Sequence, residues 1–207
     1  MPRSSNRISS ASVPESLREI GYPCVHLKIG EGIVTGRNVL VSTVLGSCVA
    51  VSFYCAARGV AGLFHAMLPT SVGARGADTT PCKFVDSAIH CIFDQFRKKG
   101  IAEKDIELKL FGGAFSMGTG APEHVRNVVN VGGRNVEVAR QVLATLNLKI
   151  SRESVGGAHG RKLVFDTTTG DVWVKMLGRT EEQALFREES VLLPVAEGRA
   201  CPLNDDR

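Results

Sequence analysis

The stretch that decides the fold joins two β-rich runs through a short turn. It reads VLVSTV at residues 39–44, LGSC at residues 45–48 and VAVSFY at residues 49–54. Val, Thr, Phe and Tyr favour strands because branched and aromatic side chains pack well on a pleated surface. Glycine between two such runs favours a turn. The sequence therefore predicts a strand, a turn at Gly46 and a second strand that begins just after Cys48.

The next β-rich run, VAGLFHAM at residues 60–67, carries His65. Neighbouring strands bring their side chains together, so we expect Cys48 and His65 to meet. This pair predicts a nucleophile and its base, in which the thiolate attacks an acyl carbon and the imidazole handles the proton. A free cysteine has a pKa of about 8.5, and an imidazolium beside Cys48 would favour its thiolate. The alternative is that Cys48 is a small core residue, as buried cysteines often are.

The rest of the chain adds further strands and two helices. A helix is predicted from Thr80, a good N-cap, and Pro81, which suits the first helical position, to Gly100 at its C-terminal end. Residues 32–38 are predicted as a loop because Gly and Asn punctuate them. The second helix is predicted at residues 134–146. The other strands are predicted at residues 24–30, 106–110, 148–153 and 161–177. Many strands with two helices indicate a single α/β (α+β) domain.

Composition sets the limits of this domain. Residues 1–20, rich in Ser and Arg, are predicted to be a flexible N-terminal tail, and residues 179–207 form a C-terminal extension to a domain at residues 21–178. No apolar run approaches the roughly 20 residues of a membrane span. The N-terminus lacks the apolar segment of an export signal, so we expect a cytoplasmic protein whose cysteines stay reduced.

Charge and cysteine spacing exclude two classes of function. Lys and Arg number 25 against 21 for Asp and Glu, a net charge of +4, and no motif of a nucleic-acid reader accompanies this mild excess. A structural zinc site usually takes two closely spaced pairs of ligands, and the six cysteines do not supply two such pairs. We therefore expect no nucleic-acid partner and no metal.

Seven short blocks extend the pattern around Cys48 and His65. They lie, in order, at residues 43–51, 65–69, 83–89, 108–114, 133–135, 156–162 and 169–175. As an ordered set, these blocks resemble the chemoreceptor glutamine deamidase family CheD, over about residues 24–178. The resemblance implies a layered α/β/β sandwich with the active site at one edge of the strands.

The resemblance also implies a reaction. Cys48 would attack the side-chain carboxamide of a receptor glutamine, His65 would manage the proton, and water would hydrolyse the thioester to glutamate without cofactor or metal. Backbone N–H groups around Gly46 and Ser47 are the candidate donors to the oxyanion. The same thiol chemistry implies esterase activity on receptor glutamyl methyl esters.

A third group should orient His65, and two hydroxyl residues compete for this role. Family members place a threonine just before the LGSC turn, where this chain has Ser42 followed by Thr43. Strand alternation puts Ser42 and Thr43 on opposite faces, and it puts Ser42 on the face of Cys48 if the strand runs straight through the turn. The turn interrupts this alternation, so it does not decide between them. We favour Ser42, because its hydroxyl would do the same orienting work as the family's threonine, with Thr43 as the alternative.

The implied partners are methyl-accepting chemotaxis receptors, through their cytoplasmic helices, and a CheC-type phosphatase. Two other functions compete with receptor deamidation. One is a non-catalytic chemotaxis adaptor that binds receptors or the phosphatase. The other is a cysteine peptidase or transglutaminase-like enzyme, against which the blocks outside the active site argue.

Overall fold

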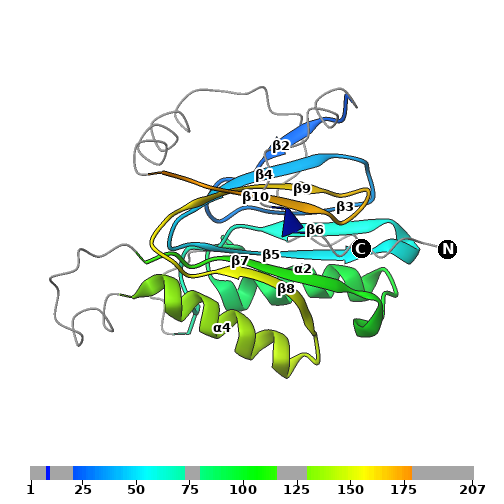
Figure 1. The fold of residues 1–207 in the computed structure, drawn as a ribbon. Helices are drawn as coiled ribbons and strands as arrows, with labels where there is room; N and C mark the ends of the chain where they lie inside the picture. Colours follow the sequence, from blue (N-terminus) through cyan, green and yellow to red (C-terminus); the bar gives the residue numbers. More distant parts are fainter. Residues whose placement is uncertain (1–7, 10–20, 73–79, 116–129, 179–207) are drawn as a thin grey trace, which may run out of the picture.

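The two β-rich runs form strands in two different sheets. In the computed structural model, which describes residues 8–9, 21–72, 80–115 and 130–178, they are strands β4 (Leu40–Leu45) and β5 (Val49–Cys55). Strand β4 belongs to one five-stranded sheet and strand β5 to the other. The turn at residues 46–48 therefore carries the chain from sheet to sheet (Figure 1).

The first sheet has the order β1-β10-β9-β4-β2. Its other strands are β1 (Ile8–Ser9), β2 (Cys24–His26), β9 (Arg161–Asp166) and β10 (Val172–Met176). Strand β4 pairs antiparallel with β9 and parallel with β2, so that Ser42 lies opposite His26. The turn at residues 168–171 connects β9 and β10, which are antiparallel neighbours. Apart from β1, the two predicted extensions lie outside the described residues.

The second sheet has the order β3-β6-β5-β7-β8. Its strands besides β5 are β3 (Gly32–Thr35), β6 (Val60–Phe64), β7 (Glu107–Gly112) and β8 (Ile150–Val155). The 3-10 helices η1 (Ala56–Arg58) and η2 (Glu103–Asp105) lie at the connections before β6 and β7. Strand β5 is central and pairs antiparallel with both β6 and β7.

Helices α2 (Val85–Lys98) and α4 (Val131–Thr145) cover one face of the second sheet (Figure 1). One buried cluster joins their apolar faces to alternate residues of β5, among them Val51 and Phe53. The intervening residues of β5 face the first sheet, where Ala50 and Tyr54 join a second cluster with Val41. The layers are thus helices, sheet and sheet, which confirms the α/β/β sandwich. Among the described helices, none is long and apolar enough to cross a membrane.

Two local predictions were wrong. The first helix begins at Val85 rather than at Thr80, because residues 80–83 form a turn and the carbonyl of Lys83 accepts hydrogen bonds from Met67 and Leu68 instead of from the helix. Residues 32–35, predicted as part of a loop, form strand β3, because pairing with β6 outweighs the local glycine signal. Gly100 does take the left-handed conformation expected after a helix, with φ of 69°.

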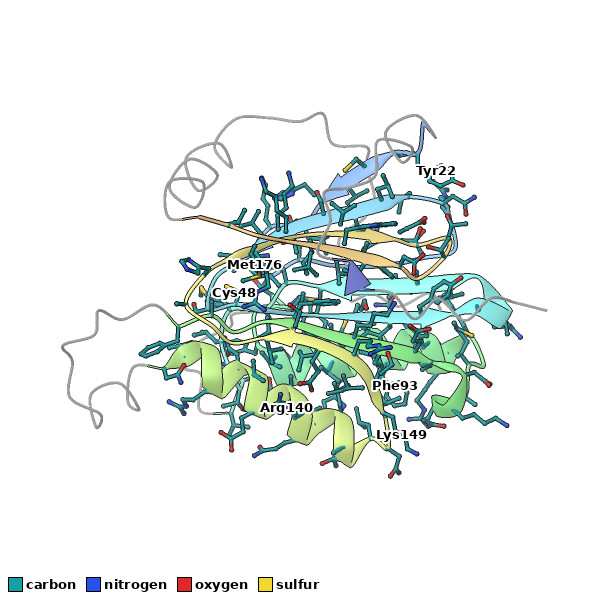
Figure 2. The ribbon with its side chains drawn as sticks, viewed as in Figure 1. Tyr22, Cys48, Phe93, Arg140, Lys149 and Met176 are labelled. Atoms are coloured by element: carbon teal, nitrogen blue, oxygen red, sulfur yellow. The ribbon has the colours of Figure 1, made fainter. Side chains whose placement is uncertain are left out.

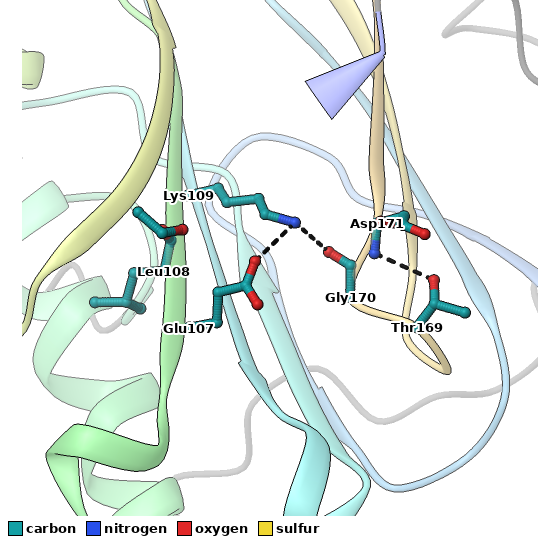
Figure 3. Close-up of polar contacts among 7 residues, drawn as sticks. Glu107, Leu108, Lys109, Thr169, Gly170 and Asp171 are labelled. Carbon is teal, nitrogen blue, oxygen red and sulfur yellow. Dashed lines mark hydrogen bonds and ion pairs between the residues drawn. The ribbon is translucent and has the colours of Figure 1, made fainter. Parts of the chain in front are cut away.

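The lysine of the 108–114 block has a structural place between the sheets. Lys109 is buried on β7, and its Nζ lies 3.0 Å from Glu107 Oε1 and donates to the carbonyl of Gly170 at 2.8 Å (Figure 3). Gly170 belongs to the β9–β10 turn of the first sheet. This contact ties the two sheets together at the end of the sandwich that lies away from Cys48.

Candidate active site

Cys48 and His65 come together at the end of the sandwich where β4 stops and β5 begins. Val49 and Ala66, the residues that follow them, exchange two backbone hydrogen bonds of 2.9 Å each. In this antiparallel register Cys48 lies opposite Met67, and His65 is its diagonal neighbour on the same face. Diagonal neighbours lie roughly 7–8 Å apart in the backbone, within reach of a long side chain. Figure 2 shows Cys48 at this end, between the two sheets.

Thr43 reaches His65 from the opposite sheet. Its Oγ1 lies 2.8 Å from His65 Nδ1 and donates to the carbonyl of Leu27 at 2.9 Å. A hydroxyl has only one proton to donate. Since that proton goes to Leu27, the Nδ1–H of His65 must be the donor to Thr43. The neutral ring then carries its basic lone pair on Nε2, an atom that is buried and has no hydrogen-bond partner among the described residues.

Burial favours the neutral form of the His65 ring. The side chain is 2% exposed, and desolvation lowers its pKa from 6.5 to about 4. The nearby Leu27 backbone carbonyl opposes this lowering of the His65 pKa, and the charge of His26 adds to it. The expected imidazolium is therefore corrected: at neutral pH the ring is uncharged and can accept a proton.

The preference for Ser42 was wrong, because Thr43 is the residue that contacts His65. Alternation along β4 points Thr43 toward the second sheet and Ser42 toward the outer face of the first. There Ser42 Oγ lies 3.1 Å from His26 Nδ1 and accepts a contact of 3.9 Å from Cys24 Sγ. Strand alternation could not decide between the two hydroxyl residues, because the turn carries the chain from β4 in one sheet to β5 in the other.

The turn itself is fixed through its carbonyl groups. The carbonyl of Gly46 accepts from the backbone N–H of Ala114 at 2.8 Å, and that of Cys48 accepts from Gly113 at 2.8 Å. The carbonyl of Ser47 accepts from Asn135 Nδ2 at 2.9 Å. In a trans peptide the N–H points opposite to the C=O. The N–H groups of Ser47 and Cys48 are thus aimed away from β7 and α4, as donors to an oxyanion would need to be.

Cys48 is largely covered, whereas the residue before it is open. Cys48 is 8% exposed and packs in the cluster between the sheets, while Gly46 is half-buried and Ser47 is exposed. No disulfide joins the cysteines of the described residues. A thiol that is nearly buried beside a neutral base, next to an exposed turn, fits a nucleophile reached by one extended side chain.

Two contributors to the site were missed from the sequence. Leu27 acts through its backbone carbonyl, which leaves no signal in residue type. Asn135 was noted only as part of the block at residues 133–135. Its contact with Ser47 depends on how α4 packs against the second sheet.

Comparison with known proteins places these features in a family. A family model described as "CheD chemotactic sensory transduction" matches residues 67–176. A protein of Oleidesulfovibrio alaskensis named "Probable chemoreceptor glutamine deamidase CheD" is 51% identical over 177 residues, which cover 86% of this chain and 84% of that protein. A protein of the same name from Nitratidesulfovibrio vulgaris is 48% identical, over 85% of this chain and 88% of its own length. A third relative, "Probable chemoreceptor glutamine deamidase CheD 2" of Geobacter sulfurreducens, is 40% identical over 77% of this chain and 93% of its own length.

Proposed function

This chain belongs to the CheD family, and we propose that it is a protein-glutamine deamidase that acts on the cytoplasmic helices of methyl-accepting chemotaxis receptors. The observation that carries the proposal is the contact between Thr43 and His65. It gives the ring a defined tautomer with its basic nitrogen turned away from Thr43, on the face that His65 shares with Cys48.

The first half of the reaction forms a thioester. His65 Nε2 accepts the thiol proton as Cys48 Sγ attacks the side-chain carbonyl carbon of the glutamine. The resulting oxyanion accepts hydrogen bonds from the N–H groups of Ser47 and Cys48. The imidazolium, held by Thr43, then returns its proton to the amide nitrogen. The C–N bond breaks, ammonia leaves, and a γ-glutamyl thioester remains on Cys48.

The second half regenerates the enzyme. His65, neutral again, takes a proton from a water molecule as that water attacks the thioester carbon. The C–S bond breaks, the proton returns to the sulfur of Cys48, and the product is glutamate. A glutamyl methyl ester would follow the same course with methanol as the leaving group, which extends the proposal to receptor methylesterase activity.

The shape of the site fits a side chain presented on a helix. Cys48 is nearly covered while Ser47 beside it is exposed, so a residue must extend its side chain to reach the sulfur. A glutamine on the surface of a receptor helix is long enough to do so. Because such helices are cytoplasmic, we place the activity in the cytoplasm, with recruitment to receptor arrays at the inner face of the membrane.

Ammonia release and receptor binding together test this proposal. A purified receptor cytoplasmic fragment is incubated with the wild-type chain or with Cys48→Ala, and both ammonia and retained complex are measured. The proposal predicts ammonia release with the wild type and none with Cys48→Ala, although both bind the fragment. Binding without ammonia release in either protein would favour the adaptor function, with a receptor or a CheC-type phosphatase as its partner. Main-chain cleavage would favour a peptidase.

A further inference from the structure

We propose that Asn135 is a positioning residue that sets the geometry between Cys48 and His65 through a single side-chain amide. The proposal deepens the function proposed above and rests on it. It also gives a role to the block at residues 133–135, which the mechanism itself does not use.

One amide nitrogen bridges the two segments that carry the nucleophile and the base. Asn135 is fully buried, and its Nδ2 donates to the carbonyl of Ser47 and to the carbonyl of Met67, each at 2.9 Å. A side-chain amide has two N–H donors, so both bonds form at once. The orientation of the amide is unambiguous, because carbonyl groups only accept and the Oδ1 of Asn135 could not replace Nδ2.

The bond to Ser47 fixes the peptide that carries the proposed oxyanion donor. The carbonyl of Ser47 and the N–H of Cys48 belong to the same planar unit and point in opposite directions. Holding the carbonyl toward α4 therefore aims the N–H of Cys48 away from it. Loss of the bond would let this peptide rotate and would misdirect the donor.

The bond to Met67 secures the segment of His65. Met67 lies directly opposite Cys48 in the pairing that Val49 and Ala66 establish. The turn and the His65 segment are therefore connected in two ways: directly, through the Val49–Ala66 pairing, and through Asn135 on α4. Such double fixation restrains the distance from the thiol to the imidazole.

Glycines on both sides of the contact let α4 approach closely enough. A Cβ on Gly132 would lie 2.5 Å from the carbonyl oxygen of Ala114, and one on Gly113 would lie 2.4 Å from Val136 Cγ2. Both are closer than packed atoms allow. Gly113 and Ala114 in turn hydrogen-bond the carbonyls of the Cys48 turn. The blocks at residues 108–114 and 133–135 thus form one unit beneath the nucleophile.

The polarity of Asn135 is hard to explain by packing. Its Oδ1 is buried and has no hydrogen-bond partner among the described residues. Burying an acceptor in this way destabilises a fold, so an apolar residue would suit a merely structural position in α4 better. The amide is explained by its two donated bonds, which act on the active site.

Three variants test the role. Asn135→Ala removes both bonds, and Asn135→Asp keeps the shape but offers a donor only when its carboxyl is protonated. Leu143→Ala, at a buried position eight residues further along α4, is the matched control for lost packing. For each, kcat and KM for receptor deamidation, the rate of Cys48 alkylation by iodoacetamide and the cooperativity of urea unfolding are measured between pH 5 and pH 8.

We expect Asn135→Ala to lose about 10²-fold in kcat, the effect of one misplaced oxyanion donor, with KM little changed. Leu143→Ala should keep the wild-type kcat. Asn135→Asp should recover activity relative to wild type as the pH falls, since protonation restores a donor. Wild-type kcat in folded Asn135→Ala, or the same loss in Leu143→Ala, would overturn the proposal.

Alkylation separates this proposal from the proposed function. If the wild-type chain releases no ammonia, the deamidase function fails, yet the reactivity of Cys48 toward iodoacetamide still reports its pairing with His65. In that case slower alkylation in Asn135→Ala than in Leu143→Ala supports the positioning role, and equal rates contradict it. If Asn135→Ala does not unfold cooperatively, the pH dependence of kcat in Asn135→Asp tests the positioning role instead. A pH profile parallel to that of the wild type would contradict the role.

Discussion

Thr43 and His65 lie in different sheets, yet their side chains approach to 2.8 Å between Oγ1 and Nδ1. The Leu27 carbonyl takes the only proton of the Thr43 hydroxyl, so the ring must donate to Thr43. This arrangement does for His65 what a carboxylate does in a serine-hydrolase triad, because it selects the tautomer and holds the ring. A neutral acceptor, however, stabilises the imidazolium less than a charged one would.

The two hydroxyl residues should therefore differ sharply in their effect on catalysis. Thr43→Ala removes the acceptor for Nδ1–H and should lower kcat by about 10²-fold, the lower end of what a positioned base contributes. Thr43→Ser should retain most of the activity, because the hydroxyl remains. Ser42→Ala, which alters only the outer face, should stay close to wild type. A larger loss in Ser42→Ala than in Thr43→Ala would return the orienting role to Ser42.

The pH dependence of catalysis should follow the low pKa of His65. The ring must be neutral to accept the thiol proton, and burial lowers its pKa to about 4. As the pH falls, kcat/KM should therefore hold through the ordinary histidine range and decline only as the pH approaches 4. A pH–rate profile on a receptor fragment measures this acidic limb. An inflection near 6.5 would show that His65 titrates as an exposed histidine and would contradict the burial argument.

The same lowered pKa couples His65 to stability. The unfolded chain has an ordinary histidine pKa, so between pH 6.5 and pH 4 it binds more protons than the folded chain. The contribution of His65 to the free energy of unfolding is fully present above pH 6.5. It is lost as the pH falls toward 4, by roughly 3 kcal/mol in all. Urea unfolding of wild type and His65→Gln across this range isolates the effect. The free energy of unfolding of the wild type should fall more steeply with acid, and parallel curves would argue against it.

Lys109 offers a prediction about stability away from the active site. Lys109→Ala removes the ion pair with Glu107 and the bond to Gly170, which should cost about 3 kcal/mol. Replacing both charges, as in Lys109→Met with Glu107→Leu, should recover much of that loss, since both members of the ion pair are replaced by apolar side chains. Urea unfolding measures both variants. The folded proteins should keep the wild-type kcat, and a large fall in kcat would mean that the site extends further than described.

The sequence predicted the elements well where pattern and packing agree. The runs at residues 39–44 and 49–54 became β4 and β5 because both are rich in strand-forming side chains and are buried on both faces. The start of α2 failed for a tertiary reason. Thr80 and Pro81 are good helix-start residues, but residues 80–83 form a turn. Hydrogen bonds from Met67 and Leu68 to the Lys83 carbonyl then delay the helix until after Phe84.

The candidate site was predictable as far as the approach of Cys48 to His65 and no further. Cys48 and His65 follow from residue type and from the strand-turn-strand pattern. The choice between Ser42 and Thr43 depended on which sheet each strand joined, and strand alternation carries no information across a change of sheet. The role of Asn135 depends on the packing of α4 against β7, which no local pattern encodes.

The most direct test of the central claim follows the oxygen atom that enters the product. A receptor cytoplasmic fragment is incubated in water enriched in oxygen-18 with wild-type protein or with Cys48→Ala, and its peptides are analysed by mass spectrometry. The account predicts that particular glutamines become glutamates carrying one solvent oxygen, with wild type only, because water hydrolyses a thioester on Cys48. The same conversion with Cys48→Ala, or no conversion with either protein, would contradict it.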